Sequence, residues 1–222
     1  YKLAGFTEAA LKEWQTLYTL KPDNVYLKNK INMMRFVRGN VKVSFPFRDY
    51  IIHKTYTASE YLRYGFTHPI DLTVDKEKNI YITSFNTGNL IKYDINGKPE
   101  FTTKPSFSGK LYGIDYYNKT LAVTDFENDC IYIMDTTGSV IRTIGKSGKG
   151  NGMFNGPEGV AFNKQGFLYI VDSGNSRVQK LSLQGKFVLS FGKEGSYEGD
   201  FSKPTDAAVL HHKVYVVDRG NR

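Results

Sequence analysis

The chain has 222 residues, of which 40% are hydrophobic and 23% are charged, so its composition indicates a globular protein with a core rather than a disordered one. It contains no apolar run long enough to cross a bilayer, and we expect no transmembrane segment in it. The formal net charge is +8. Its lysines and arginines are spread along the chain, which favours a solvated surface over a dedicated nucleic-acid patch.

Residues 1–39 are predicted to be helical. Apolar side chains recur at helical spacing and fall on one face of the first helix; they are Phe6, Ala10, Trp14 and Leu17. Pro22 ends this helix, and a second helix follows and ends at Gly39.

This segment resembles a tetratricopeptide (TPR) repeat, a helical hairpin of about 34 residues. The residues at the matching offsets are Tyr1, Ala10, Trp14, Leu17 and Pro22, with leucine at 17 where the family usually has alanine. The resemblance implies a groove that binds other proteins. An unrelated helical hairpin that caps the following domain is the alternative interpretation.

Residues 40–63 form a basic, aromatic-rich connector. Val41, Val43 and Phe45 alternate with polar residues, which indicates a half-buried strand. This strand could belong to the following domain or act as a linker. Basic residues among aromatics can bind single-stranded nucleic acid, but tyrosines that pack between strands explain the same composition, and we favour that interpretation.

From residue 64 to residue 222 the sequence repeats itself. Ser84, Asp125, Asp172 and Asp218 recur at spacings of 41, 47 and 46 residues, and Gly97, Gly138 and Gly185 follow the same first two offsets. A period of about 40 to 50 residues with several short strands per unit is typical of a β-propeller blade. The fold class is therefore predicted to be mainly β, with a short helical segment before the propeller.

The third copy, which begins near Gly156, also carries a specific signature. The signature residues are Pro157, Gly159, Asp172, Gly174, Asn175 and Arg177, and the next copy repeats them as Asp218, Gly220, Asn221 and Arg222. They resemble the NHL repeat, whose propellers mostly have six blades. About three and a half blades are present, so we expect the chain to be a segment of a longer protein that continues beyond Arg222.

Candidate chemical groups are few. Asp172 and Asp218 recur once per blade and are predicted to serve the blade itself. The glycine- and lysine-rich run 145–159 is predicted to connect two blades rather than to cradle phosphate, because a strand follows it where a phosphate loop needs a helix. Cys130 lies in a strand pattern and is predicted to be a buried thiol.

The histidines carry no metal-site spacing. They are His53, His68, His211 and His212, and only the last two are adjacent. We therefore predict no catalytic, cofactor-binding or metal-ligating residue and no cofactor.

The sequence leads to a prediction of a non-enzymatic protein-interaction scaffold within a larger assembly, placed by family resemblance in the periplasm or cell envelope of a bacterium. Its partners would be other proteins, bound through the TPR-like groove and the propeller faces. Binding of single-stranded RNA is the alternative. A metal-dependent propeller lyase or lactonase is a third hypothesis, for which the predicted first strands offer Asp71, Asp115 and Asp206.

Overall fold

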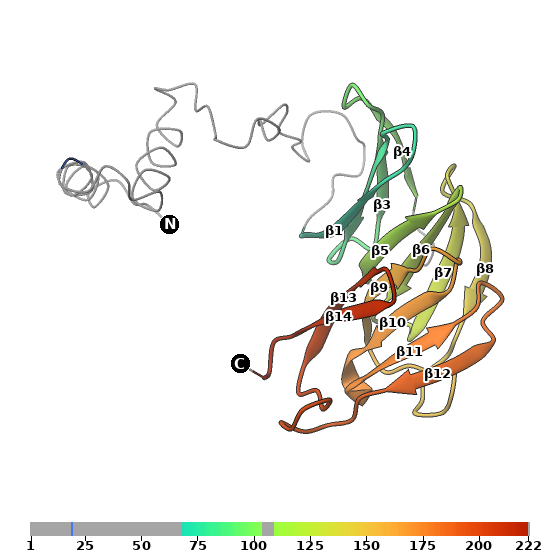
Figure 1. Ribbon diagram of the computed structural model, residues 1–222. Coiled ribbons are helices and arrows are strands. Elements are labelled where there is room, and N and C mark those ends of the chain that lie inside the picture. Colours follow the sequence, from blue (N-terminus) through green and yellow to red (C-terminus); the bar gives the residue numbers. More distant parts are fainter. Residues whose placement is uncertain (1–18, 20–67, 104–108, 222) are drawn as a thin grey trace. The chain divides into compact units, whose positions relative to one another are not determined.

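The computed structural model describes residue 19 and residues 68–103 and 109–221 (Figure 1). The chain divides into two compact units, Tyr1–Thr55 and Tyr56–Arg222, and every strand described below belongs to the second unit. The TPR-like residues Tyr1, Ala10, Trp14, Leu17 and Pro22 lie outside the described residues, as does the connector 40–63.

The described part of the second unit consists of antiparallel sheets in which consecutive strands are neighbours. The first sheet contains β1 (Pro69–Val74), β2 (Ile80–Ser84), β3 (Leu90–Tyr93) and β4 (Pro99–Thr103). The second contains β5 (Leu111–Tyr117), β6 (Thr120–Asp125), β7 (Cys130–Asp135) and β8 (Val140–Ile144).

The third sheet contains β9 (Pro157–Phe162), β10 (Leu168–Asp172), β11 (Arg177–Leu181) and β12 (Phe187–Phe191), with the short 3-10 helix η1 (Ser173–Asn175) after β10. The fourth sheet is the pair β13 (Pro204–Leu210) and β14 (Lys213–Asp218). Three four-stranded sheets and one pair confirm the predicted mainly β, propeller-like architecture of repeated units.

Apolar side chains fill the spaces between successive sheets. One buried cluster joins Ile131 and Ile133 of the second sheet to Phe162 and Ile170 of the third, and another joins Tyr81 of the first sheet to residues of the second. The faces of neighbouring sheets thus supply the core, because a single twisted sheet cannot bury its own apolar face.

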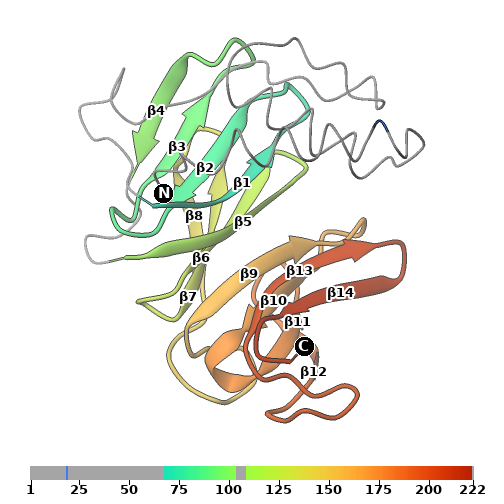
Figure 2. The ribbon, with the colours of Figure 1, turned by 90° about the vertical axis from the view of Figure 1, so that its left-hand side faces the viewer.

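In the third sheet, burial falls from the first strand to the last. All six residues of β9 are buried, whereas four of the five residues of β12 are exposed. β9 contacts both β5 and β13, the first strands of the adjacent sheets, and Figure 2 shows β9 beside β13. β9, which lies between two other first strands, is therefore fully enclosed.

The predicted glycine turns before the fourth strands have left-handed backbone conformations. The φ angles of Gly97, Gly138 and Gly185 are 74°, 84° and 83°, a region that costs other residues energy. At Gly138 space is also short, since an added Cβ would lie 2.6 Å from the Phe101 ring.

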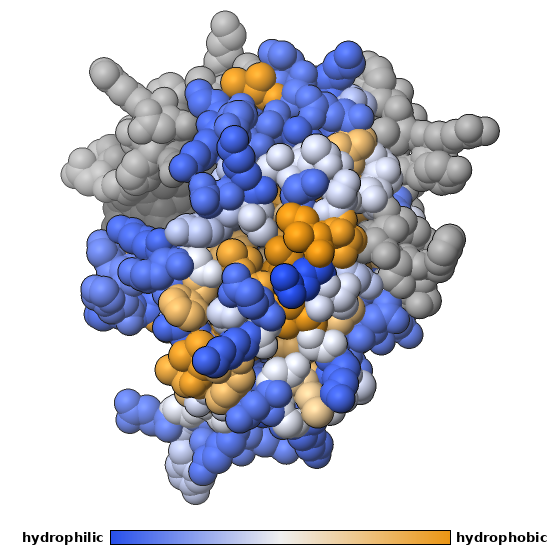
Figure 3. All heavy atoms as spheres, turned by 90° about the vertical axis from the view of Figure 1, so that its right-hand side faces the viewer, coloured by the Kyte–Doolittle hydropathy of each residue, from blue (hydrophilic) through white to orange (hydrophobic). Residues whose placement is uncertain are grey.

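The outer strands β8 and β12 expose some apolar side chains, among them Ile141 and Val188. In the space-filling view of that side of the molecule, orange apolar patches are separated by polar side chains (Figure 3). Among the described residues no helix has the length and hydrophobicity that a membrane crossing would need.

Candidate functional site

The signature aspartate of the third sheet is the centre of a buried hydrogen-bond network. Asp172 is fully buried and accepts the backbone N–H of Asn155 (2.8 Å). It also accepts hydrogen bonds from Arg177 Nε (2.7 Å), Asn175 Nδ2 (2.9 Å) and Gln179 Nε2 (3.1 Å). The carboxylate thereby ties the end of β10 to β11 and to the segment that leads into β9.

Asp218 does the same in the fourth sheet. It accepts the backbone N–H groups of Ser202 (2.9 Å) and Lys203 (2.7 Å) and the Asn221 side-chain amide (2.8 Å). Burial alone would raise the pKa of Asp218, but these backbone hydrogen bonds lower it below its ordinary value. Because their oxygens are already engaged, both signature aspartates act as structural groups.

The remaining signature residues shape the same region. Pro157 opens β9 opposite Asp172, and an added Cβ at Gly159 would lie 2.6 Å from the Cα of Asp206. Glycine is required there because β9 and β13 approach each other closely. Gly174 and Gly220 follow the signature aspartates in the turns of their sheets, and Arg222 lies outside the described residues.

The first-strand aspartates join neighbouring sheets. Asp71 of β1 accepts the backbone N–H of Ile114 on β5 (2.9 Å), and Asp115 of β5 accepts that of Phe162 on β9 (2.7 Å). Burial raises the pKa of Asp71, Asp115 and Asp206 above the ordinary value. Within residues 68–103 and 109–221, no group of three or more His, Cys, Asp or Glu side chains could hold a metal ion.

The three first-strand aspartates do not all occupy the same position in their strands. Asp71 and Asp206 both lie two residues after the strand's first residue, which pairs with the end of the second strand. They occupy equivalent positions, whereas Asp115 lies four residues after Leu111. Glycines stand at the position equivalent to Asp71 in β5 and β9, where the next first strand passes closely.

The other candidates lie apart from this region. His211 and His212 form the exposed turn between β13 and β14, and His53 lies outside the described residues. The glycine-rich run connects β8 to β9, and no helix follows it. Burial raises the pKa of the Cys130 thiol to about 11, as expected of an inert buried thiol.

A pocket of ≈ 380 Å³ lies where second strands end and first strands begin. We call it the strand-end pocket. Residues after β6, β10 and β14 and at the beginning of β9 and β13 contribute to it, including Phe126, Glu158, Ser173, Ser202, Lys203 and Arg219. Three successive sheets therefore build its wall.

Glu158 is the unusual residue of the strand-end pocket. It is 8% exposed, and its Oε2 is buried without a hydrogen-bond partner among the described residues. Burial raises the pKa of the neighbouring Tyr112 to about 12, assisted by the charge of Glu158 and by hydrogen bonding of the Tyr112 hydroxyl to the Glu158 carboxylate, and opposed by the charge of Arg219. A buried carboxylate oxygen without a hydrogen-bond partner is energetically costly, which distinguishes Glu158 from the other residues that line the strand-end pocket.

Aromatic rings lie beside this carboxylate. The ring centroids of Phe85 and Tyr112 are 6.0 Å apart, and Phe126 lies 5.8 Å from Phe85 and 6.4 Å from Tyr112. Lys110 Nζ lies 5.5 Å from the Phe85 centroid and forms an ion pair with Glu127 (2.7 Å). Phe126 belongs both to this aromatic cluster and to the pocket.

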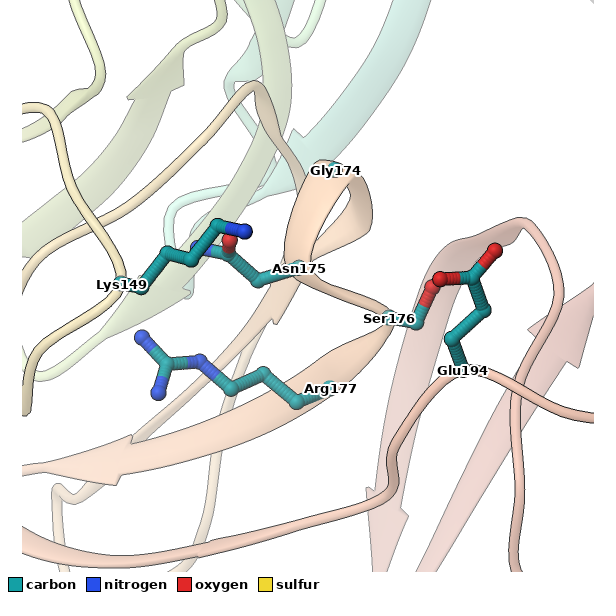
Figure 4. Close-up of a pocket in the computed structure, with 6 residues that line it drawn as sticks. All are labelled: Lys149, Gly174, Asn175, Ser176, Arg177 and Glu194. Carbon is teal, nitrogen blue, oxygen red and sulfur yellow. The ribbon is translucent and has the colours of Figure 1, made fainter.

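A second pocket, of ≈ 190 Å³, adjoins the first and shares Gly174, Ser176 and Glu194 with it. In Figure 4 the Lys149 side chain extends toward Asn175, and the carboxylate of Glu194 approaches Ser176 from the other side. The guanidinium of Arg177 is held by Asp172 and by the carbonyl oxygens of Gly150 and Met153. Arg177, one of the residues that line this second pocket, is therefore part of the hydrogen-bond network around Asp172.

Sequence reasoning did not single out Glu158, Tyr112 or Phe126. The available signal was positional: Phe85, Phe126, Ser173 and Arg219 each follow the last residue of a second strand, and this position changes from phenylalanine in the first two sheets to serine and arginine in the next two. A position that recurs in every sheet but holds different residues is a candidate for binding, because the fold does not fix its side chain. Here this position supplies two aromatic rings, from Phe85 and Phe126, and one cation, from Arg219.

Comparisons with known proteins agree with this architecture. Residues 154–181 match the NHL repeat. The chain is 32% identical over 74 residues to protein brain tumor of Drosophila melanogaster, which covers 33% of this chain and 7% of that protein. It is 31% identical over 107 residues to a probable peptidyl-alpha-hydroxyglycine alpha-amidating lyase of Caenorhabditis elegans, covering 46% of this chain and 29% of the relative.

Among solved structures, the fold is similar to that of virginiamycin B lyase from Staphylococcus aureus, with a TM-score of 0.54 and 14% sequence identity. The match covers 68% of this chain and 49% of the lyase, so the chain spans about half of that structure and less than a third of either relative. The described sheets belong to the class of propeller-like repeat structures. Within them, residues 154–181 match the NHL repeat, in agreement with the resemblance seen in the sequence of the third sheet.

Proposed function

We propose that this chain is a non-enzymatic binding module that holds a partner protein at the strand-end pocket and acts as a scaffold within a larger assembly. The observation that carries the proposal is the buried, unpartnered Oε2 of Glu158 in a pocket built by three sheets. Binding needs a rigid surface with a few unsatisfied polar groups, and this pocket has both.

The rigidity comes from the signature aspartates. Asp172 and Asp218 fix the segments that lead into β9 and β13, from which Glu158 and Ser202 reach the pocket. The site is therefore pre-organised, which lowers the entropy lost on binding. The TPR-like residues 1–39 would add a second protein-binding surface, and the bacterial envelope stays our proposed setting.

Single-stranded RNA is the second candidate partner, favoured by Lys110 above the Phe85 ring beside two further aromatic rings. Stacking and a nearby cation are what such binding requires. However, Glu127 already neutralises Lys110, and Glu158 would repel phosphate. These charges favour a protein partner.

A lyase activity has less support from the described residues. The inward aspartates Asp71 and Asp115 are engaged by backbone N–H groups of the next sheet. Their geometry therefore favours a structural role over metal ligation.

The test is to recover the intact protein with its companions under gentle, low-salt conditions and to identify them by mass spectrometry and absorbance. We expect protein partners in fixed stoichiometry, and we expect them to be lost from a Phe126→Ala/Arg219→Ala variant. Val188→Ala, on the outer strand β12, is the control and should retain them. Salt-labile nucleic acid in place of protein would overturn the proposal.

A further inference from the structure

We infer that the strand-end pocket receives a lysine side chain of the partner protein, with Glu158 as the counter-charge of its ammonium group. This inference rests on the proposed protein-binding function and adds the chemistry that the partner must present. It follows from the position of Glu158 in the repeat, from the groups around it and from the charges at the rim.

The fold itself does not require a carboxylate at position 158. Glu158 directly follows Pro157, which pairs with the end of β10. The equivalent positions in the other sheets hold neutral residues, namely Ile70, Tyr112 and Thr205. None of these three positions holds a carboxylate, so the sheet can form without one. Burying the Glu158 carboxylate therefore costs stability, and residues that cost stability in this way are typical of binding sites.

The inner wall of the pocket suits an ammonium group. Ser173, Ser202 and Phe126 line the pocket together with Glu158. An ammonium group has three donors and no acceptor, so one carboxylate and neighbouring hydroxyl oxygens can satisfy it. An aromatic ring beside the cation adds a favourable interaction with its π face.

The rim carries two cations and one carboxylate, because the exposed Glu194 also lines the pocket. Lys203 and Arg219 line the pocket and are both exposed, whereas Glu158 is buried. The ion pairs within the described residues do not include Glu158. A partner segment in which acidic residues flank the lysine would place its carboxylates against these rim cations while its ammonium reaches Glu158.

The experiment compares two tripeptides, acetyl-Asp-Lys-Asp-amide and acetyl-Asp-norleucine-Asp-amide, titrated into the intact protein and followed by amide chemical shifts. We expect the lysine peptide to bind about tenfold tighter or more, because only its ammonium can donate to Glu158. The shifts should centre on Glu158, Phe126 and Gly156.

Glu158→Gln keeps the shape of the side chain and removes its charge, and it should erase the difference between the two peptides. Glu198→Gln removes the same charge from an exposed position outside the pocket and should preserve the difference. Thermal unfolding of each variant checks that it is folded. Equal binding of both peptides to the wild-type protein, or a lysine preference that survives in Glu158→Gln, would overturn the inference.

Arg219→Ala separates the pocket from its rim. If the rim cations contact the flanking aspartates, this variant weakens both peptides equally and leaves the lysine preference intact. If Arg219 itself occupies the pocket in solution, the variant instead strengthens binding of the lysine peptide, which contradicts the role given to the rim.

The outcomes also distinguish the inference from the function on which it rests. Native protein partners that stay bound to Glu158→Gln, together with no lysine preference, would overturn the lysine site and leave the binding module standing. A lysine preference without any native protein partner would support the site and count against the scaffold role.

Discussion

The carboxylate of Asp115 on β5 accepts the backbone N–H of Phe162 on β9 at 2.7 Å, so one side chain connects the first strands of two sheets. Asp71 makes the same kind of connection from β1 to Ile114 on β5. Neighbouring first strands are linked through side chains at these points, which gives the series of sheets a defined register.

Removal of this link should destabilise the unit. Asp115→Ala leaves the N–H groups of Phe162 and Tyr116 without their acceptor. Because unsatisfied buried donors are costly, we expect the free energy of unfolding to fall by about 1–3 kcal/mol. Urea denaturation measures the loss, and Glu77→Ala at an exposed turn serves as the control. Equal stability of Asp115→Ala and the wild type would show that the link is not used.

The same aspartates predict a pH dependence of stability. The pKa values of Asp71 and Asp115 are raised by burial, so the folded state binds their protons more tightly than the unfolded state does. Their contribution to stability therefore falls as the pH rises from about the ordinary value of 3.8 through the raised folded-state pKa.

Urea unfolding at a series of pH values above 3.8 should show this decline, superimposed on the effects of other groups. The decline should be smaller in Asp71→Asn/Asp115→Asn, whose side chains do not titrate. Parallel pH profiles for the variant and the wild type would contradict the assignment.

Asp172 should be among the most sensitive positions of the third sheet. Asp172→Ala leaves Arg177 without its carboxylate partner and removes the acceptor of the Asn155 N–H. Loss of one member of a buried ion pair costs about 3–5 kcal/mol.

The matched control for Asp172→Ala is Asp218→Ala, since Asp218 lies in a more exposed setting. Its effect should be smaller in thermal or chemical denaturation. If the two variants lose equal stability, burial is not what makes the Asp172 network important.

Gly159→Ala tests the close approach of β9 and β13. The added Cβ would lie 2.6 Å from the Cα of Asp206, so one strand must move away from the other. Overpacking of this kind costs about 1–3 kcal/mol. Gly150→Ala is the control, because the nearest atom to its added Cβ is the Met153 sulfur at 3.2 Å. Calorimetric melting of both variants would decide, and an unchanged melting temperature for Gly159→Ala would refute the close approach.

Much of the fold could be predicted because the residues that define each repeated unit act on neighbours close to them in the sequence. The aspartate or serine at each second-strand end and the glycine before each fourth strand are visible as a period. Each acts over a short range: the glycines adopt positive φ, and Asp172 binds residues of its own sheet and the segment leading into it. Local geometry of this kind can be predicted from the sequence.

The proposed binding site could not be predicted in the same way. The strand-end pocket combines Phe126, Glu158 and Arg219, which follow or begin strands in three different sheets. In the sequence Glu158 is one charged residue within a repeat signature. What distinguishes it is the burial of its carboxylate beside the Tyr112 hydroxyl, which depends on how the sheets pack.

The sequence by itself determined the repeated four-stranded unit, its turns and the structural use of its aspartates, because these depend on backbone conformation and short-range hydrogen bonds. Tertiary structure alone decided that Asp71 and Asp115 join neighbouring sheets and that Glu158 lies buried beside Phe126. The physical reason is that burial and the proximity of groups from different sheets arise only when those sheets pack together.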